Sequence, residues 1–371
     1  MSSERHMKGF KKSLSYRRGI RCSHTETLLQ NCLDANNKVY VVGDVHGHFE
    51  TFRALIHRLK LRPEDIVLCL GDMIDRGPDS AGLISFIRNH PNIICIKGNH
   101  EQMAIQSLTD SGGFEAWKPW MQRGGKSTYG SYIVQSNGDL WKAKAKMIDD
   151  FSWLDTLPTE IVLDAYRFVH AGYDPHVPMS KQSEAEHLWI RKQWYQSDKV
   201  VDSKRTIFFG HSTTTKFGLG GDIVPSGHTI DDGRSAWVAV DVGAYNHVLP
   251  SLVAVDVKSL KVIRQQTLPS EQWFVDGVQG SVDKKLQRWK RPSSRQESDT
   301  AIHFGLHILK HQIHSSPQRE RLEIAKLRAA GLKMMGRRHG SSAKIGNYTF
   351  RVYPQKKKAV YENVIQRAEV V

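Results

Sequence analysis

Six side chains that bind hard or borderline divalent cations lie in five small polar clusters in the middle of the sequence. They offer carboxylate, imidazole and amide donors, which such cations prefer. Six donors of this kind suit two metal ions that lie about 3.5–4 Å apart and share one bridging carboxylate. The sequence therefore predicts a two-metal site made from Asp44, His46, Asp72, Asn99, His170 and His211.

Each polar cluster directly follows a short apolar run rich in β-branched or aromatic residues. Runs of this length and composition are typical of strands buried on both faces. Helix-like segments at 49–59 and 80–89 separate the first three runs, which indicates an α/β fold. Ligands of such sheets bind beyond the carboxyl ends of the strands, so we expect the five clusters to meet. The runs are 39–42, 66–70, 93–96, 167–169 and 206–209.

The spacing of the first three clusters is regular. Asp72 follows Asp44 by 28 residues and Asn99 follows Asp72 by 27 residues, about one strand-helix repeat each. A single Gly-Asp-x-His can be an ordinary turn, because Asp and Gly dominate turns. Three such clusters, each after a predicted strand, indicate a single functional site and not three unrelated turns. Two later runs, 237–241 and 252–257, are predicted to be closing strands of a second sheet.

The motifs resemble the signature blocks of the phosphoprotein phosphatase family of metallophosphoesterases. The blocks are Gly43-Asp-Val-His-Gly47, Gly71-Asp-Met-Ile-Asp-Arg-Gly77 and Gly98-Asn-His-Glu101, followed by His170-Ala-Gly172 and Gly210-His-Ser212. Bacterial and bacteriophage-type members are the most similar, on the evidence of Gly98-Asn-His-Glu-Gln-Met103, Gly124-Gly125 and Leu188-Trp-Ile-Arg191. The resemblance covers residues 39–262. It implies a calcineurin-like sandwich of two mixed β-sheets flanked by helices.

The same resemblance implies a role for each site residue. Asp44, His46 and Asp72 would hold one metal, and Asp72, Asn99, His170 and His211 the other. A metal-bridging hydroxide would attack phosphorus in line, with Mn²⁺ as the first choice of metal and Fe or Zn as alternatives. Arg76 and Arg191 would hold the phosphate oxygens, and His100, oriented by Asp75, would protonate the leaving oxygen.

Some of these residues have simpler interpretations. Asp75 and Arg76 could be an ion pair in a turn, His100 a core or capping histidine, and Arg191 a surface arginine. The chain departs from the family at Asp241-Val-Gly-Ala244, where Asp-Thr-Gly-Ala is common, and at His211-Ser, where His-Thr is usual. We expect neither departure to change a metal ligand.

The net charge of +15 lies at the two ends of the chain. Residues 1–38 carry +5 and residues 283–371 carry +13, while the centre carries −3. We therefore predict a basic N-terminal extension (1–38), a catalytic domain (39–282) and a basic C-terminal extension or small accessory domain (283–371). A transit peptide is an alternative for the N-terminal segment. The four cysteines form no CxxC pair, and no apolar run suits a membrane span, so we expect a cytoplasmic protein.

The leading hypothesis is a serine/threonine protein phosphatase that acts on phosphoproteins or small phosphoesters. The alternatives are a symmetrical dinucleoside tetraphosphate hydrolase, or a phosphatase tethered to nucleic acid or an acidic partner by its basic tail. The resemblance favours the phosphatase, because Asp75-Arg76 and Glu101 are intact. Residues 123–127, Arg-Gly-Gly-Lys-Ser, are not a P-loop, since Trp120 replaces its first glycine. His303, His307 and His311 could bind metal, but a solvated face explains them better.

Overall fold

The computed structural model describes residues 19–108, 113–217, 221–245 and 249–271, together with three strands between residues 341 and 370. Its helices and helical turns are α2 (Ser23–Asp34), α3 (Phe49–Leu59), α4 (Ser80–Asn89), α5 (Asn99–Leu108), α6 (Gly113–Trp120), η1 (Met121–Gly125), α7 (Lys126–Gln135), α8 (Leu140–Asp155), η2 (Met179–Lys181), α9 (Glu184–Trp189), α10 (Lys192–Tyr195) and η3 (Thr214–Phe217). Its strands are β1 (Val39–Val42), β2 (Ile66–Cys69), β3 (Ile93–Cys95), β4 (Glu160–Val162), β5 (Tyr166–Val169), β6 (Thr206–Phe209), β7 (Val224–Pro225), β8 (Trp237–Ala239), β9 (Ser251–Asp256), β10 (Val262–Gln266), β11 (Ser341–Ile345), β12 (Tyr348–Val352) and β13 (Ala368–Val370).

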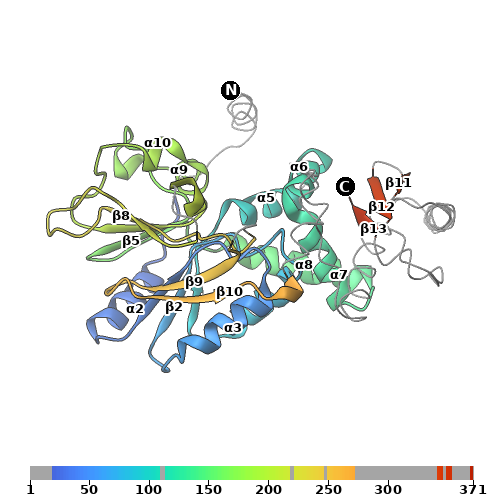
Figure 1. Cartoon of the computed structure of the whole chain (residues 1–371), viewed down its shortest axis with the longest axis horizontal. Helices are drawn as coiled ribbons and strands as arrows, with labels where there is room; N and C mark the ends of the chain where they lie inside the picture. The colour runs from blue at the N-terminus through green and yellow to red at the C-terminus, as the bar shows by residue number, and fades with distance from the viewer. Residues whose placement is uncertain are drawn as a thin grey trace.

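Two five-stranded mixed sheets form the catalytic domain (Figure 1). The first sheet has the order β10-β9-β1-β2-β3, and the second has the order β4-β5-β6-β8-β7. β1, β2 and β3 run parallel, as do β5, β6 and β8. The parallel strands of each sheet therefore end at one edge, as the sequence predicted. The two-sheet sandwich confirms the predicted fold class.

One strand lies in a different sheet from the one predicted. The run 252–257 was expected to close the second sheet, but β9 pairs antiparallel with β1 and β10 in the first sheet. All six residues of β9 are buried. A strand buried on both faces has no polar side to indicate its neighbours, so only the long-range pairing decides its sheet. The other predicted closing strand, β8, does lie in the second sheet.

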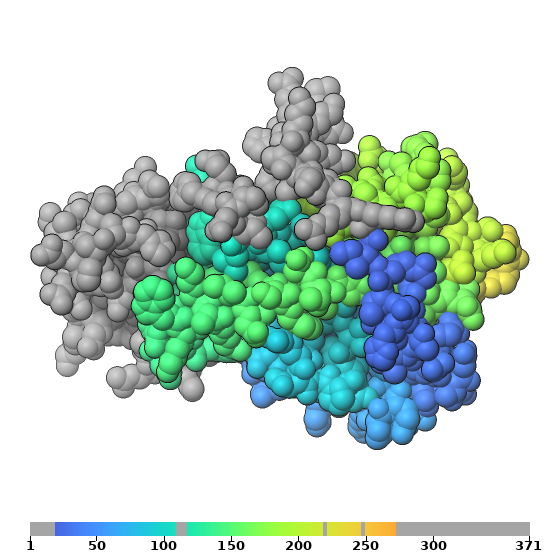
Figure 2. Space-filling model, turned by 180° about the vertical axis from the view of Figure 1, so that it is seen from behind, coloured from blue at the N-terminus to red at the C-terminus, as the bar shows by residue number. Residues whose placement is uncertain are grey.

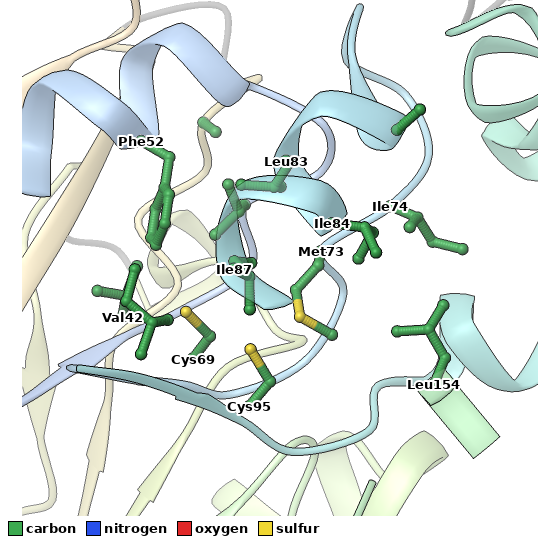
Figure 3. Packing of buried hydrophobic residues seen from close by; sticks show 14 of the residues in the cluster. Val42, Phe52, Cys69, Met73, Ile74, Leu83, Ile84, Ile87, Cys95 and Leu154 are labelled. Atoms are coloured by element: carbon green, nitrogen blue, oxygen red, sulfur yellow. The ribbon is translucent and has the colours of Figure 1, made fainter. Parts of the chain in front are cut away.

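The alternation of side chains along β1 divides the core into layers. Val39 and Val41 belong to the cluster between the two sheets, together with Phe168 and Phe208 of the second sheet. Tyr40 and Val42 point to the opposite face and pack in the cluster beneath the helices. Figure 3 shows side chains of that helix-covered layer, where Phe52 and Ile87 lie above Val42, Cys69 and Cys95. Because the first sheet is buried on both faces, its packing holds the loops at its carboxyl edge in place.

The described part of the predicted N-terminal extension packs on the catalytic domain. Leu29, Cys32 and Leu33 of α2 are buried in the cluster between the sheets. The Ile20 backbone N–H donates to Thr159 Oγ1 (2.9 Å), and Figure 2 shows the dark blue residues around α2 lying against the green part of the chain. Within residues 19–38, the segment therefore contributes to the core. The domain boundaries themselves stay a prediction.

The C-terminal region is described only in its strands, β11, β12 and β13, which form an antiparallel sheet. The predicted linker at 287–299, the predicted helix from Ser316 and the His303, His307 and His311 series lie outside the described residues. Among the helices of the described residues, none is both long enough and apolar enough to cross a bilayer.

Candidate binuclear metal centre

The loops after the strands hold several site residues in the left-handed backbone region. Among the described residues, nine that are not glycine have a positive φ, and five of these are predicted site residues. Such backbone conformations are costly for non-glycine residues and cluster at functional sites. The five are His46 (φ 48°), Asp72 (φ 50°), Asp75 (φ 73°), Arg76 (φ 70°) and His211 (φ 61°).

One group of predicted ligands comes from the loops after β1 and β2. His46 Nε2 lies 3.8 Å from Asp44 Oδ2 and 3.7 Å from Asp72 Oδ2. The other ring nitrogen, Nδ1, lies 2.8 Å from the Ile74 carbonyl oxygen and donates its proton there. This hydrogen bond leaves the lone pair on Nε2, facing the two carboxylates. All three side chains are buried, with exposed fractions of 2% or less.

A second group joins Asp72 to the loops after β3, β5 and β6. His170 Nε2 lies 3.5 Å from Asp72 Oδ1, 2.9 Å from Asn99 Oδ1 and 3.1 Å from His211 Nδ1. His170 Nδ1 donates to the Leu70 carbonyl at 2.8 Å, so its Nε2 also carries a lone pair. Asp72 thus faces one group with Oδ2 and the other with Oδ1. This is the arrangement expected of a bridging carboxylate.

The electrostatics of the cluster fit cations. Burial and the neighbouring carboxylates raise the pKa of Asp44 and of Asp72 well above its usual range. Burial holds the pKa of His46 and of His211 well below its usual range and lowers the pKa of His170 to about 3. The imidazoles are therefore neutral, the form that binds metal, and crowded carboxylates gain most from an added positive charge. The residues present fit a pair of divalent metals.

Asp241 joins this cluster, although the sequence analysis assigned it no role. The Asp241 carboxyl accepts a hydrogen bond from the Gly243 backbone N–H, and it lies close enough to Asp44 and Arg76 for both to influence its pKa. Burial raises the pKa of Asp241 to about 6. Its Oδ2 is a buried atom without a hydrogen-bond partner among the described residues. The sequence signal for it is the Asp-x-Gly-Ala motif, in which Asp241 stands before the departure at Val242.

Arg76 lies against the first group of ligands. Its Nη1 lies 2.7 Å from His46 Nε2 and its Nη2 lies 3.0 Å from His100 Nε2. The guanidinium stacks on Tyr245, with 4.5 Å between Cζ and the ring centroid. A planar cation with several donors, held beside the metal ligands, suits a phosphate group.

His100 and Asp75 form a buried pair beside the metal ligands. His100 Nδ1 lies 2.6 Å from Asp75 Oδ2, while His100 Nε2 lies 3.9 Å from Asp72 Oδ2. Asp75 also accepts hydrogen bonds from Trp120 Nε1 (2.9 Å to Oδ2) and from Thr128 Oγ1 (2.7 Å to Oδ1). Distance alone would also allow His100 as a ligand. The Asp75 contact distinguishes it, because that carboxylate fixes the imidazole with Nε2 facing the site.

Glu101 organises the loop that carries Asp72, a role that the sequence analysis did not assign. Its carboxylate accepts hydrogen bonds from the backbone N–H groups of Asp72, Met73 and Gly98, all at 2.8 Å. The side chain is fully buried. A carboxylate that binds several backbone N–H groups ties the loops after β2 and β3 together.

Arg191 comes from the turn between α9 and α10. Its Nη1 donates to the His211 carbonyl oxygen (3.1 Å) and lies 3.4 Å from Ser212 Oγ. Its charge is among those that lower the pKa of His100 and of His211. The structure therefore brings Arg191 to the same place as the other nine predicted site residues. Their individual roles stay predictions.

Fold and site together define a metallophosphoesterase, a two-sheet sandwich with a buried metal-binding cluster at the strand ends. The chain belongs to the calcineurin-like phosphoesterase family, whose model matches residues 37–235. It is a member of the phosphoprotein phosphatase type within that family and hydrolyses phosphoric ester bonds.

Named relatives agree with this assignment. The chain is 35% identical to serine/threonine-protein phosphatase 2 of Escherichia coli over 47% of this chain and 78% of that protein. It is 36% identical to serine/threonine-protein phosphatase 1 of Salmonella typhimurium over the same shares. A symmetrical bis(5'-nucleosyl)-tetraphosphatase of Methylococcus capsulatus is 28% identical over 40% of this chain and 49% of its own length.

Proposed function

We propose that this protein is a metal-dependent serine/threonine protein phosphatase. The observation that carries the proposal is the position of Arg76, which contacts both a predicted metal ligand, His46, and the Asp75-bound His100. Metal ligands, a phosphate-binding guanidinium and a proton donor thus share one buried cluster. The similarity to two bacterial enzymes named serine/threonine-protein phosphatases supports a phosphoprotein substrate.

The residues divide the work of hydrolysis between them. Asp44, His46, Asp72, Asn99, His170 and His211 would hold two divalent cations, which supply an activated nucleophile near neutral pH and positive charge at the phosphoryl group. Arg76 and Arg191 hold the phosphate oxygens in place. The phosphorus gains an oxygen from water and loses the seryl oxygen. The attacking water releases one proton, which His100 Nε2 takes up and gives to the leaving oxygen, so the products are a hydroxyl side chain and inorganic phosphate.

The donor set favours Mn²⁺ as the working metal. Carboxylates, one amide oxygen and neutral imidazoles make a mixed oxygen and nitrogen site, which Mn²⁺ accepts readily. Among the described residues, the groups that could hold a metal consist of histidines and aspartates and include no cysteine. Fe and Zn remain alternatives for the same ligands.

The alternative substrate is a dinucleoside tetraphosphate. It is favoured by the relatives named symmetrical bis(5'-nucleosyl)-tetraphosphatase, although the alignment to the first of these covers 49% of its length. Such a substrate would use the same metal ligands and arginines. Location in the cytoplasm and a nucleic-acid tether in the basic tail stay predictions.

Substrate profiling of the metal-loaded enzyme tests the proposal. A phosphoserine peptide, diadenosine tetraphosphate, a cyclic nucleotide and p-nitrophenyl phosphate should be compared in Mn²⁺ by kcat/KM. We expect the peptide to exceed the two nucleotides by tenfold or more, and chelation to abolish all turnover. Faster hydrolysis of diadenosine tetraphosphate would replace the phosphatase assignment. Turnover by protein that metal analysis shows to be free of bound ions would refute the two-metal site.

A further inference from the structure

Two exposed basic residues come from segments that lie near the predicted phosphate-binding arginines. Arg123 is on η1, which packs on the helical layer of the first sheet, and Lys216 is on η3, which follows β6 of the second sheet. Arg76 and Arg191, in contrast, are half-buried. The site therefore has two cations near the metal ligands and two further out, at its solvent-exposed rim.

The position of Arg123 follows from the close packing of its neighbour, Gly124, on Arg76. The Arg76 backbone N–H donates to the Gly124 carbonyl oxygen at 3.3 Å. A Cβ on Gly124 would lie 2.9 Å from the Arg76 backbone nitrogen, and its φ of 120° also requires glycine. Arg123 is thus held next to the predicted phosphate-binding loop, and its charge is among those that lower the pKa of His100. The stretch 123–127, which is not a P-loop, nevertheless reaches the site.

Lys216 is held near the site by the loop after His211. The Thr214 backbone N–H donates to the Asp241 carbonyl oxygen at 2.8 Å, which fixes the start of η3 beside the metal-binding cluster. Arg191 and Lys216 both lie close enough to His211 that each of their charges lowers its pKa. The carboxylates of Asp241 and Asp44 act to raise the pKa of Lys216, but Asp44 is a predicted metal ligand, so a bound metal would neutralise its charge.

A single phosphoryl group does not require the two outer cations. It presents three non-bridging oxygens, and Arg76, Arg191 and the two predicted metals are already four positively charged groups around them. Arg123 and Lys216 are exposed and come from two different layers of the fold, so the negative charge that they complement lies outside the reacting phosphate. A peptide extends from both sides of its phosphorylated residue and can present charge to both cations.

We propose that Arg123 and Lys216 form a basic rim that selects phosphopeptides with acidic residues beside the phosphorylated serine or threonine. The proposal rests on the protein phosphatase function proposed above. Exposed charge pairs are individually weak and screened by salt. We therefore expect a preference of roughly five- to tenfold in kcat/KM for a phosphopeptide flanked by Glu over the same peptide flanked by Gln at low salt, shared between the two cations.

The test measures the two peptides and p-nitrophenyl phosphate as substrates of five variants, one of which is a control. Arg123→Gln and Lys216→Met should each lower the Glu/Gln preference by about two- to threefold, the double variant should abolish it, and Arg123→Lys should keep it. Arg58→Gln is the matched control. Arg58 is an exposed residue in the last turn of α3, about 14 Å along the helix axis from the start of that helix near the site. Its loss should leave the preference unchanged.

Each outcome distinguishes this proposal from the one on which it rests. A double variant that keeps the full preference, or a preference that persists at 0.5 M salt, would overturn the basic rim. A double variant that loses activity on inorganic tripolyphosphate but not the peptide preference would assign the rim to condensed phosphates instead. Hydrolysis of p-nitrophenyl phosphate with no turnover of either peptide would refute the protein phosphatase function, and the rim proposal with it.

Discussion

The two sheets contribute to the site in different ways. The first sheet supplies Asp44, His46, Asp72 and Asn99 from three consecutive strand-loop units. Glu101 ties the loops after β2 and β3 together, and the His46 backbone N–H donates to the Asp72 carbonyl oxygen between the loops after β1 and β2. The second sheet supplies two histidines and Arg191 from loops that are less regularly spaced. One half of the site is therefore encoded in a compact repeat, whereas the other half reaches it only through packing between the sheets.

Two hydrogen bonds at the junction of the sheets show how closely the halves depend on each other. His170 Nδ1 donates to the Leu70 carbonyl at 2.8 Å, and the His211 backbone N–H donates to Asp44 Oδ1 at 2.8 Å. At Gly71, a Cβ would lie 2.9 Å from the His170 ring. Each histidine of the second sheet is thus oriented by the first sheet, so the second half of the site needs the first half to be in place.

Asp72→Asn should have the largest effect of the changes considered, because Asp72 is the residue that both halves share. A neutral amide bridges two cations poorly, so kcat should fall by roughly 10²–10³-fold or more, with loss of bound metal. Metal content and kcat should be measured on the same preparation. Asp139→Asn is the control, since Asn also caps a helix and Asp139 caps α8 away from the site. Near-normal values for both would show that Asp72 is not the bridge.

His100→Asn tests a function that the first sheet would perform alone. We expect kcat on phosphoserine to fall by roughly 10²–10⁴-fold with metal content unchanged, as for the loss of a general acid. The loss should be smaller on p-nitrophenyl phosphate, whose leaving group needs little protonation. Equal losses on the two substrates would contradict the proton-donor role, and loss of metal would make His100 a ligand.

His211→Ala tests the second sheet by itself. The first group of ligands remains complete, so we expect the bound metal to fall from about two ions per chain to about one, with kcat reduced by roughly 10²-fold. Metal analysis after gel filtration measures the stoichiometry. Loss of both ions would show that the first sheet does not hold a metal without the second. Retention of both would remove His211 from the ligand set.

Deletion of the chain from Lys284 onward should have the smallest effect. All predicted ligands precede this point, and Glu271, the last described residue of the domain, still binds the start of α3 through the Glu50 and Thr51 N–H groups. We expect p-nitrophenyl phosphate turnover within about twofold of the full chain, and binding to anionic macromolecules that is weaker and less salt-dependent. A truncated protein that does not fold would show that the tail belongs to the domain.

Short windows of sequence were enough to predict the strands and to select the site residues that the structure brings together. β1, α3 and α4 coincide with the predicted segments 39–42, 49–59 and 80–89. A buried strand or an amphipathic helix can be predicted there because its apolar pattern involves only neighbouring residues. All ten predicted site residues meet in one cluster, because parallel strands end at the same edge. The prediction that placed β9 in the second sheet was wrong, because a run of six buried residues fits either sheet.

By itself, the sequence determined which residue types could bind metal and phosphate, and that they follow strands. Only the tertiary structure decided which distant groups support them. Trp120 and Thr128 donate hydrogen bonds to Asp75, and Asp241 lies near Asp44. The segment that carries Arg123 packs beside Arg76. The reason is physical. Local periodicity and turn chemistry act over a few residues, whereas contacts between segments far apart in the chain exist only when the sheets and helices bury their apolar faces against each other.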